Sequence, residues 1–347
     1  QKDAANGVVL AWENTIKKAA NEGTLVLREA ILASDRKDEP LEPLEIPMQY
    51  QEYIKSIEVF LALVPDDENR SSFDYLAADT FYRYQHWEEA EKRYQAVIAN
   101  YPAEDVGKYS ANVLLDIYLT HKRYQDVADS IEGYGKDELL NKHEGFLESL
   151  VPIRSGALFK VAEKTMADEK FDEAAERYIA LVDENPKFEF ADSALNNAAV
   201  CFEKNKRYDS ASKMYQRIFD SYPKSALADT ALFRVAVNAE RFFDFDKAIT
   251  TYRRLVKDYP KSPNRPDALY NVAFALENTQ QYERAAKEYL RYCDLFPDRE
   301  DAPEVCFNAG LVYEKMGDQK RLMRAMGDFI KKYAKNELHK DRVLDAH

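Results

Sequence analysis

The side chains that most often do chemistry in proteins, histidine and cysteine, are few and scattered in this chain. They are His86, His121, His143, His339, His347, Cys201, Cys293 and Cys306. No pair of histidines has the H-E-x-x-H spacing of a zinc site, and no cysteine lies at ligand spacing from a histidine. We therefore expect no metal and no cofactor, and interpret the histidines as surface or inter-helix residues.

The sequence motifs of catalysis are also missing. There is no G-x-S-x-G elbow, no Walker loop and no dinucleotide-binding glycine triplet. Acidic pairs such as Glu88-Glu89 are typical of solvated helix faces or of charges at a helix N-terminus. The chain is therefore predicted not to be an enzyme, since a catalytic module would need its residues in the irregular segments outside the repeats described below.

Two of the cysteines come close together in the chain. Cys293 lies four residues before Pro297, and Cys306 lies in the first turns of the next predicted helix, so the two side chains are level across one connection. A disulfide is one possibility, and two thiols packed as small apolar groups is the interpretation that we favour. An unpaired Cys201 slightly disfavours an oxidising compartment.

An internal repeat supplies the elements that position these residues. Its motif is an aromatic residue, Ala three residues later, an aromatic residue four further on, and a closing Pro. The clearest copies begin at Trp87, Phe171, Tyr208, Phe245 and Tyr282, and the last four starts are 37 residues apart. Weaker copies begin at Tyr50, Tyr124 and Gln319. The step from Tyr124 to Phe171 is ten residues longer than the others, which indicates an insertion.

A second helix precedes each motif and carries a small residue at the same step. These residues are Ala162, Ala199, Ala236, Ala273 and Gly310. Apolar residues four before and three after them form the stripe of a buried helix face. Each unit is thus predicted to be a helical hairpin, whose Pro prevents the second helix from continuing. Because one hairpin cannot cover its own apolar face, neighbouring hairpins must stack.

These features resemble the tetratricopeptide repeat (TPR) family, whose usual unit is 34 residues. The resemblance implies an all-α, right-handed superhelical solenoid of helical hairpins. Junctions such as SYPKSALADTAL and DYPKSPNRPDALYNVA are similar to those of bacterial envelope TPR proteins, namely outer-membrane assembly lipoproteins of the BamD type and Tol-Pal-associated coordinators. That closer resemblance extends only from about Pro186 to Gly310.

The repeat phase predicts five segments. Residues 1–48 form a helical cap or extra hairpin, 49–132 a first sub-array, 133–152 the insertion, 153–335 a second sub-array that ends in a worn capping repeat, and 336–347 a tail. The chain starts at Gln1, which indicates a removed leader or anchor. No apolar run approaches the ~20 residues that a transmembrane helix needs.

In the TPR family the first helix of each hairpin lines the concave surface and contacts the ligand. Projecting those positions onto this chain gives aromatic and aliphatic sites bordered by carboxylates. The predicted groove consists of Phe159, Asn196, Val200, Glu203, Phe233, Val237, Glu240, Tyr270, Phe274, Glu277, Phe307, Leu311 and Glu314. The alternative is that these aromatics pack between helices and the glutamates merely face solvent.

The charge of the chain and the residues of the predicted groove limit the classes of ligand that we expect. The net charge of −13 disfavours nucleic acid and anionic lipid. A clamp for a C-terminal carboxylate is also disfavoured, because Val200, Val237, Phe274 and Leu311 stand where such family members have Asn. We expect a protein or peptide of apolar and neutral or basic character, bound by a non-catalytic scaffold of a bacterial envelope assembly in the periplasm. The alternative is a cytoplasmic adaptor that recruits an enzyme or motor, and the sequence does not specify an oligomeric state.

Overall fold

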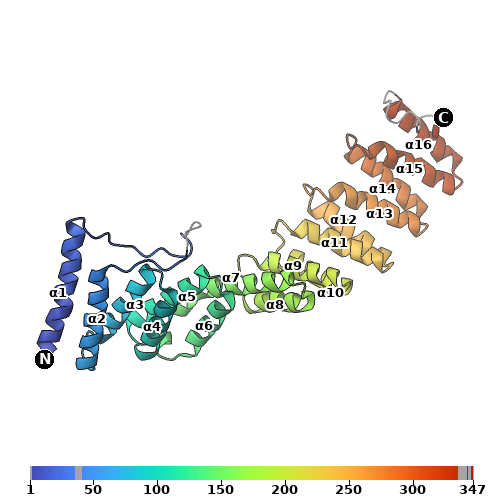
Figure 1. Cartoon of the computed structure of the whole chain (residues 1–347). Helices are drawn as coiled ribbons and strands as arrows, with labels where there is room; N and C mark the ends of the chain where they lie inside the picture. Colours follow the sequence, from blue (N-terminus) through green and yellow to red (C-terminus); the bar gives the residue numbers. More distant parts are fainter. Residues whose placement is uncertain (1, 36–40, 335–341, 343–344, 347) are drawn as a thin grey trace. The chain divides into compact units, whose positions relative to one another are not determined.

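The computed structural model describes residues 2–35, 41–334, 342 and 345–346. The regular structure of these residues consists of sixteen α-helices and one short 3-10 helix, which confirms the predicted all-α repeat solenoid (Figure 1). The chain divides into two compact units, Gln1–Val161 and Ala162–His347. Within the described residues, no helix is both long and apolar enough to cross a bilayer.

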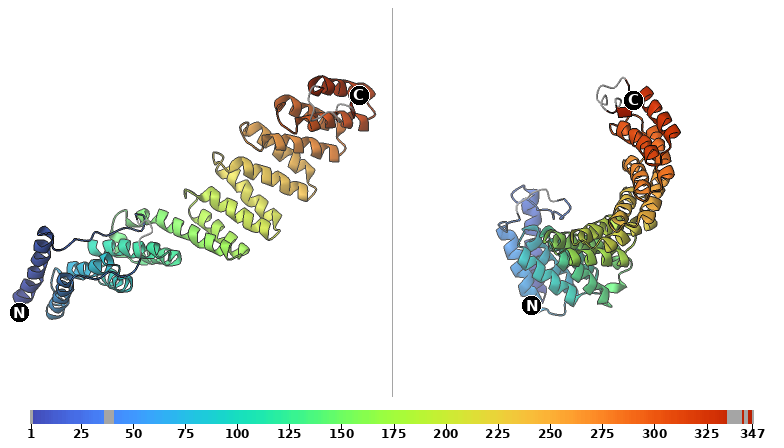
Figure 2. Two further views of the ribbon diagram at one scale, coloured as in Figure 1. Left: turned by 45° about the horizontal axis from the view of Figure 1, so that its top comes forward. Right: turned by 90° about the vertical axis from the view of Figure 1, so that its right-hand side faces the viewer.

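The second unit is a series of helical hairpins that lie side by side (Figure 2). Its helices are the end of α7 (Phe146–Ala167), then α8 (Phe171–Glu184), α9 (Ala191–Lys204), α10 (Tyr208–Ser221), α11 (Ala228–Arg241), α12 (Phe245–Asp258), α13 (Arg265–Asn278), α14 (Tyr282–Leu295), α15 (Ala302–Lys315) and α16 (Gln319–Tyr333). We call the first helix of each hairpin helix A and the second helix B. Every helix B from α8 to α16 begins at the first position of the predicted motif. Helix B then ends two residues before Pro186, Pro223, Pro260 and Pro297 in the first four hairpins.

The core of this unit is built from the small residues and tyrosines of the repeat. Ala199, Ala236 and Ala273 are fully buried in helix A. The second aromatic residue of each helix B is also buried, and Tyr252 is typical. Its ring packs 5.5 Å from that of Phe233, and its hydroxyl donates to Glu240 (3.0 Å) and accepts from Asn271 (3.1 Å). Tyr252 therefore ties helix B to helix A of its own hairpin and to the next hairpin along.

The turn between helices A and B has a left-handed residue in every hairpin from α3 onward. Six of these residues are not glycine: Gln85, Lys122, Glu169, Lys206, Phe243 and Gln280. At α11 the N–H of Phe243 donates to Glu240 O (2.9 Å) and that of Asp244 to Ala239 O (3.0 Å), which satisfies the last carbonyls of the helix. Phe243 is the unusual member, because its aromatic side chain is 79% exposed where the other turns carry polar residues or glycine.

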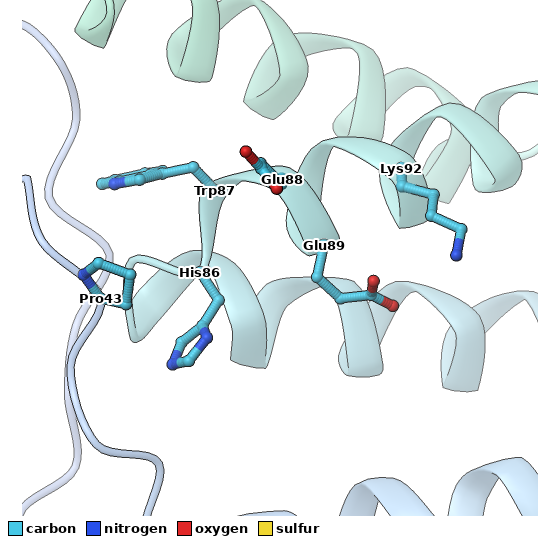
Figure 3. Close-up of a pocket in the computed structure, with 6 residues that line it drawn as sticks. All are labelled: Pro43, His86, Trp87, Glu88, Glu89 and Lys92. Atoms are coloured by element: carbon cyan, nitrogen blue, oxygen red, sulfur yellow. The ribbon is translucent and has the colours of Figure 1, made fainter.

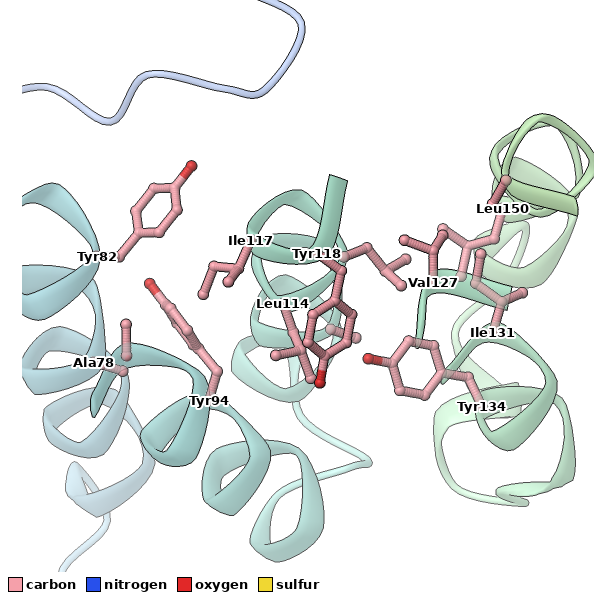
Figure 4. Close-up of a cluster of buried hydrophobic side chains, with 14 of the residues drawn as sticks. Ala78, Tyr82, Tyr94, Leu114, Ile117, Tyr118, Val127, Ile131, Tyr134 and Leu150 are labelled. Atoms are coloured by element: carbon pink, nitrogen blue, oxygen red, sulfur yellow. The ribbon is translucent and has the colours of Figure 1, made fainter. Parts of the chain in front are cut away.

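The first unit contains α1 (Lys2–Asn21), α2 (Met48–Leu63), α3 (Arg70–Arg83), α4 (Trp87–Asn100), α5 (Asp105–Thr120), α6 (Tyr124–Lys136), the 3-10 helix Leu140–Lys142 and most of α7. Helix α1 packs on α2, burying Val9, Ile16 and Phe60. A second cluster fills the space between α3 and α7 and includes Tyr82 and Tyr94 (Figure 4). Within the segment predicted as an N-terminal cap, 1–48, the helix is α1, and it packs on α2 after a long connection instead of a short turn.

The predicted insertion is largely helical. Helix α7 has 22 residues, whereas α9, α11, α13 and α15 have 14 each, so most of the additional length extends one helix A. Pro152 lies inside α7, near its start. The boundary between the two units falls within α7, between Val161 and Ala162, and not at residues 133–152. Most of the predicted tail 336–347 lies outside the described residues, as do His339 and His347.

The preferred interpretation of Cys293 and Cys306 as free thiols is wrong. They form a disulfide between α14 and α15, with Cα atoms 5.7 Å apart. The connection that contains Pro297 brings the end of helix B level with the start of the next helix A, which is the geometry that a disulfide needs. Cys201 is the free cysteine of the described chain, and burial raises the pKa of its thiol to about 11.

Two glycines in the first unit give opposite predictions. Gly107 lies in the first turn of α5, against the preceding loop, and a Cβ there would lie 2.3 Å from the backbone oxygen of Tyr101. Gly133 lies in α6, where a Cβ would meet no atom within 4 Å. We expect Gly107→Ala to lower the unfolding free energy by about 1–3 kcal/mol and Gly133→Ala to raise it by about 0.5–1 kcal/mol. Urea denaturation of both variants measures the difference, and equal shifts would contradict this packing of α5.

Candidate functional site

A hollow of about 390 Å³ lies on the helix-A face of the second unit. It is formed by α11, α13, α15 and the residue that precedes α15. Its lining residues are Phe233, Asp267, Tyr270, Asn271, Asp301, Glu304 and Val305. Phe233 and Tyr270 occupy the same position in successive repeats, so the regular 37-residue step places two aromatic rings beside one opening.

The aromatic rings are held in place from behind by buried tyrosines. Phe233 packs on Tyr252, and Tyr270 packs on Tyr289 with ring centroids 6.0 Å apart. Tyr270 also stacks on Phe274 at 6.1 Å, and Phe274 is 44% exposed. Since the supporting rings belong to the core, the apolar part of the hollow is preorganised, which lowers the entropic cost of binding.

The carboxylates of the hollow are mostly compensated by arginines. Arg299 donates to both Asp267 and Asp301 at 2.9 Å, and Arg342 donates to Glu304 at 2.7 Å. Arg299 and the hydroxyl of Tyr292 hold the pKa of Asp301 below its usual value. Three carboxylates and two guanidiniums leave one net negative charge, so the hollow is much less acidic than its glutamate and aspartate residues alone would indicate.

The structure places the predicted groove residues unequally. Phe274 is exposed on α13, and the other apolar or amide residues of this set on α9, α11, α13 and α15 are half-buried, namely Asn196, Val200, Phe233, Val237, Tyr270 and Leu311. Phe307 differs from the expectation, because its side chain is only 4% exposed and packs on Phe329, so it belongs to the core. Phe159 lies in the first unit and is therefore not part of the hollow defined here.

The predicted ladder of glutamates is largely engaged within the protein. Glu240 accepts from Tyr252, and Glu277 accepts from Tyr289 (2.9 Å) and from Lys315 (2.5 Å). Glu203 accepts from Asn238 at 3.4 Å, whereas Glu314 is exposed. Glu240 and Glu277 thus connect helix A to helix B of the same hairpin. The spacing alone did not reveal this role, because each tyrosine partner lies twelve residues away, across a turn.

Glu240 gives a prediction for the pH dependence of stability. Burial raises the pKa of its carboxyl above the ordinary value of 4.5. The folded state therefore binds this proton more tightly than the unfolded state, so this residue adds stability as the pH falls through the window just above 4.5. We expect Glu240→Gln to be more stable than the natural chain at pH 7 and to lose that advantage toward pH 4.5. Thermal unfolding measured between these pH values would contradict this sign if the advantage grew on acidification.

The remaining lining residues were not predicted. Asp267, Asn271, Asp301, Glu304 and Val305 complete the hollow, but only their contact across three helices identifies them. Within the described chain, no group of three or more His, Cys, Asp or Glu side chains is arranged to hold a metal ion. His86 and His143 instead contact backbone carbonyls, those of Leu44 (2.8 Å) and Pro102 (3.0 Å).

The hairpins with small residues at the A–B contact, and a partly open helix-A face, define a helical-repeat protein with a surface suited to protein ligands. Sequence models of the tetratricopeptide repeat match residues 74–103, 166–226 and 231–300. These segments of the chain are therefore tetratricopeptide repeats, as the motif predicts.

Comparison with solved structures finds proteins of low overall similarity. The chain is similar to MamA (15% identity, 53% of this chain and 95% of that chain, TM-score 0.39). It is also similar to YrrB, a TPR protein with an unusual peptide-binding site (12% identity, 64% of this chain and 98% of that chain, TM-score 0.38). A third similar structure is BtubC from P. vanneervenii (14% identity, 62% of this chain and 91% of that chain, TM-score 0.37). No curated protein sequence matches the chain significantly.

Proposed function

We propose that this chain is a non-catalytic scaffold that binds a protein or peptide on the helix-A face of its second unit. The observation that carries the proposal is the hollow between α11, α13 and α15, in which Phe233 and Tyr270 are held by buried tyrosines. An apolar side chain of the partner enters between the two rings, as aromatic anchors at interfaces commonly allow. The single net negative charge of the rim favours a neutral or weakly basic segment.

A double substitution tests this role of the hollow. Phe233→Ser with Tyr270→Ser removes both rings and is expected to reduce partner recovery at least tenfold, or by about 1.4 kcal/mol or more. The readout is a crosslinking pull-down from the native organism. The matched control is Leu290→Ser with Leu295→Ser, which removes two exposed apolar side chains from α14, a helix B of the same unit. Undiminished recovery with the first pair, while both variants stay folded by circular dichroism, would contradict the proposal.

We further propose that the scaffold works in a bacterial cell envelope, in the periplasm at the outer membrane. The similarity of the YPKS junctions to those of envelope TPR proteins supports this location. The Cys293–Cys306 disulfide supports it as well, because disulfides persist in oxidising compartments. The alternative is a cytoplasmic adaptor for an enzyme or motor complex, which the free Cys201 favours. Alkylating thiols in intact cells and then denaturing the chain separates the two locations. In the envelope, Cys293 and Cys306 should be joined in the disulfide and should not react with the reagent. In the cytoplasm, both should be free thiols that react after denaturation.

A further inference from the structure

Two parts of the connection between α1 and α2 contact the helix-A face of the first unit. We call its described residues, 22–35 and 41–47, the strap. The strap contacts α3, α5 and the start of α4 mainly through its main chain. Arg83 donates to Arg28 O (2.9 Å), Trp87 to Leu41 O (2.7 Å), and Ala33 N donates to Asp116 Oδ1 (2.7 Å). Two more contacts join Leu44 to the turn after α3, from Leu44 N to Tyr84 O (2.9 Å) and from His86 to Leu44 O (2.8 Å).

Asp116, which accepts from the strap, is also held by a contact within the helices. Asp116 is 9% exposed and also accepts from the hydroxyl of Tyr82 (2.5 Å), which is itself 1% exposed. Asp116 lies eight residues before Tyr124, as Val200 lies eight residues before Tyr208, so it occupies a groove position of the repeat. Asp79 and Glu163 are acidic at the same position of their repeats, but of these three carboxylates only Asp116 is buried. A buried carboxylate needs hydrogen-bond donors, and the strap supplies one from its backbone.

The side chains of the strap contribute little to this contact. Val26, Leu27 and Leu32 are 82%, 55% and 49% exposed. Leu25 packs in the cluster of α1 and α2, and Leu41 packs against the cluster between α3 and α7. Beside the strap at Pro43, a hollow of about 470 Å³ opens between Trp87, Glu89 and Lys92, as Figure 3 illustrates. The helix-A face thus contacts the extended main chain of the strap at several points, and the hollow lies beside the strap at Pro43.

We propose that the helix-A face of α3 and α5 is a second binding site, for an extended segment of a partner protein, and that the strap occupies it in cis. The incoming segment presents a carbonyl to Arg83, an N–H to Asp116 and a carbonyl to Trp87, and places an apolar side chain where Leu41 lies. The strap competes because it offers the same groups from the same chain. This site is separate from the hollow of the second unit, and each can fail without the other.

The test is binding of the strap sequence in trans. A fluorescent peptide of residues 24–47 is titrated against the full natural chain and against the full chain carrying Ala33→Pro and Leu44→Pro. The two substitutions remove the strap N–H groups that donate to Asp116 and Tyr84 and leave the helix side chains unchanged. Because the cis strap lowers the fraction of open sites, we expect the variant to bind the peptide at least tenfold more tightly, an order-of-magnitude figure.

Two controls make the result specific. The full chain carrying Val26→Ser and Leu32→Ser keeps the strap backbone and is expected to bind the peptide as weakly as the natural chain does. We call the full chain that carries Ala33→Pro and Leu44→Pro the released chain. A peptide with the same two substitutions is expected not to bind to it. Equal affinity of both peptides, or of the natural and released chains, would overturn the proposal.

A measurement on the natural chain covers the case in which the proline variant does not fold. The strap must lift while the helices remain formed, so the amides of Ala33 and Leu44 should exchange with solvent hydrogen at least tenfold faster than amides in the middle of α3, again an order-of-magnitude figure. Exchange of all these amides at one common rate would mean that the strap opens only when the unit unfolds, which would also overturn the proposal.

Discussion

Replacing Tyr252 with alanine should destabilise the second unit by about 3–5 kcal/mol, the usual cost of removing a large buried aromatic ring. Tyr252 is fully buried, supports the ring of Phe233 and satisfies both Glu240 and Asn271. The substitution therefore leaves a cavity between helices and a half-buried carboxylate without its tyrosine donor. Chemical denaturation followed by circular dichroism measures the loss.

Two companion variants separate the parts of this effect. Tyr252→Phe keeps the ring and removes only the hydroxyl, so it should cost about 1–3 kcal/mol. Lys247→Ala changes an exposed side chain of the same helix and should alter stability by less than about 0.5 kcal/mol. If Tyr252→Ala were as mild as Lys247→Ala, the tyrosine could not be the connection between neighbouring hairpins.

Reducing the Cys293–Cys306 disulfide should lower the stability of the last two hairpins by about 3 kcal/mol, the entropic value for a loop of ~15 residues. The two cysteines are 13 residues apart in sequence and connect α14 to α15. Denaturation with and without reductant, followed by hydrogen exchange in α14 to α16, measures the difference. Local exchange is needed because a repeat array can unfold in parts.

The double variant Cys293→Ala with Cys306→Ala serves as the control and should not respond to reductant. Thiol counting on the denatured natural chain provides an independent check. One reactive thiol, from Cys201, is expected without reductant, and three are expected after reduction. Three thiols without reductant would show that the disulfide is not formed.

The repeat motif predicted the fold because it consists of residues whose roles are local. A small residue is needed where helices A and B touch, an aromatic residue fills the gap beside it, and Pro prevents helix B from extending. The starts of α8, α10, α12 and α14 therefore coincide with Phe171, Tyr208, Phe245 and Tyr282. The same logic misses α1, because its partner α2 follows a long connection instead of a three-residue turn.

The binding surfaces were predictable only in part. Phe233 and Tyr270 follow from the 37-residue step, since the fold repeats with the sequence. The partners of Glu240 and Glu277 do not follow, because hydroxyl-to-carboxylate contacts depend on how helix B leans against helix A. Phe307 shares the step but lies in the last full repeat, where Phe329 and Tyr333 cover it.

The strap and the disulfide have a common reason for being hard to predict. Both join segments whose separation is set by a connection and not by the repeat. For the strap, the sequence alone did not single out Asp116, because Asp79 and Glu163 are acidic at the same position of their repeats and the position is apolar only from Val200 onward. For the disulfide, two cysteines on either side of Pro297 are compatible with packed thiols as well as with a bond.

Site-specific photo-crosslinking tests the proposed binding face of the second unit most directly. A benzophenone amino acid is placed at Tyr270 in the hollow, and in a parallel variant at Leu290, which is 37% exposed on α14. Irradiation in the native organism should yield a covalent adduct with a partner protein from position 270 and not from position 290. Adducts from position 290 alone, or equal yields from both positions, would contradict a partner bound between Phe233 and Tyr270.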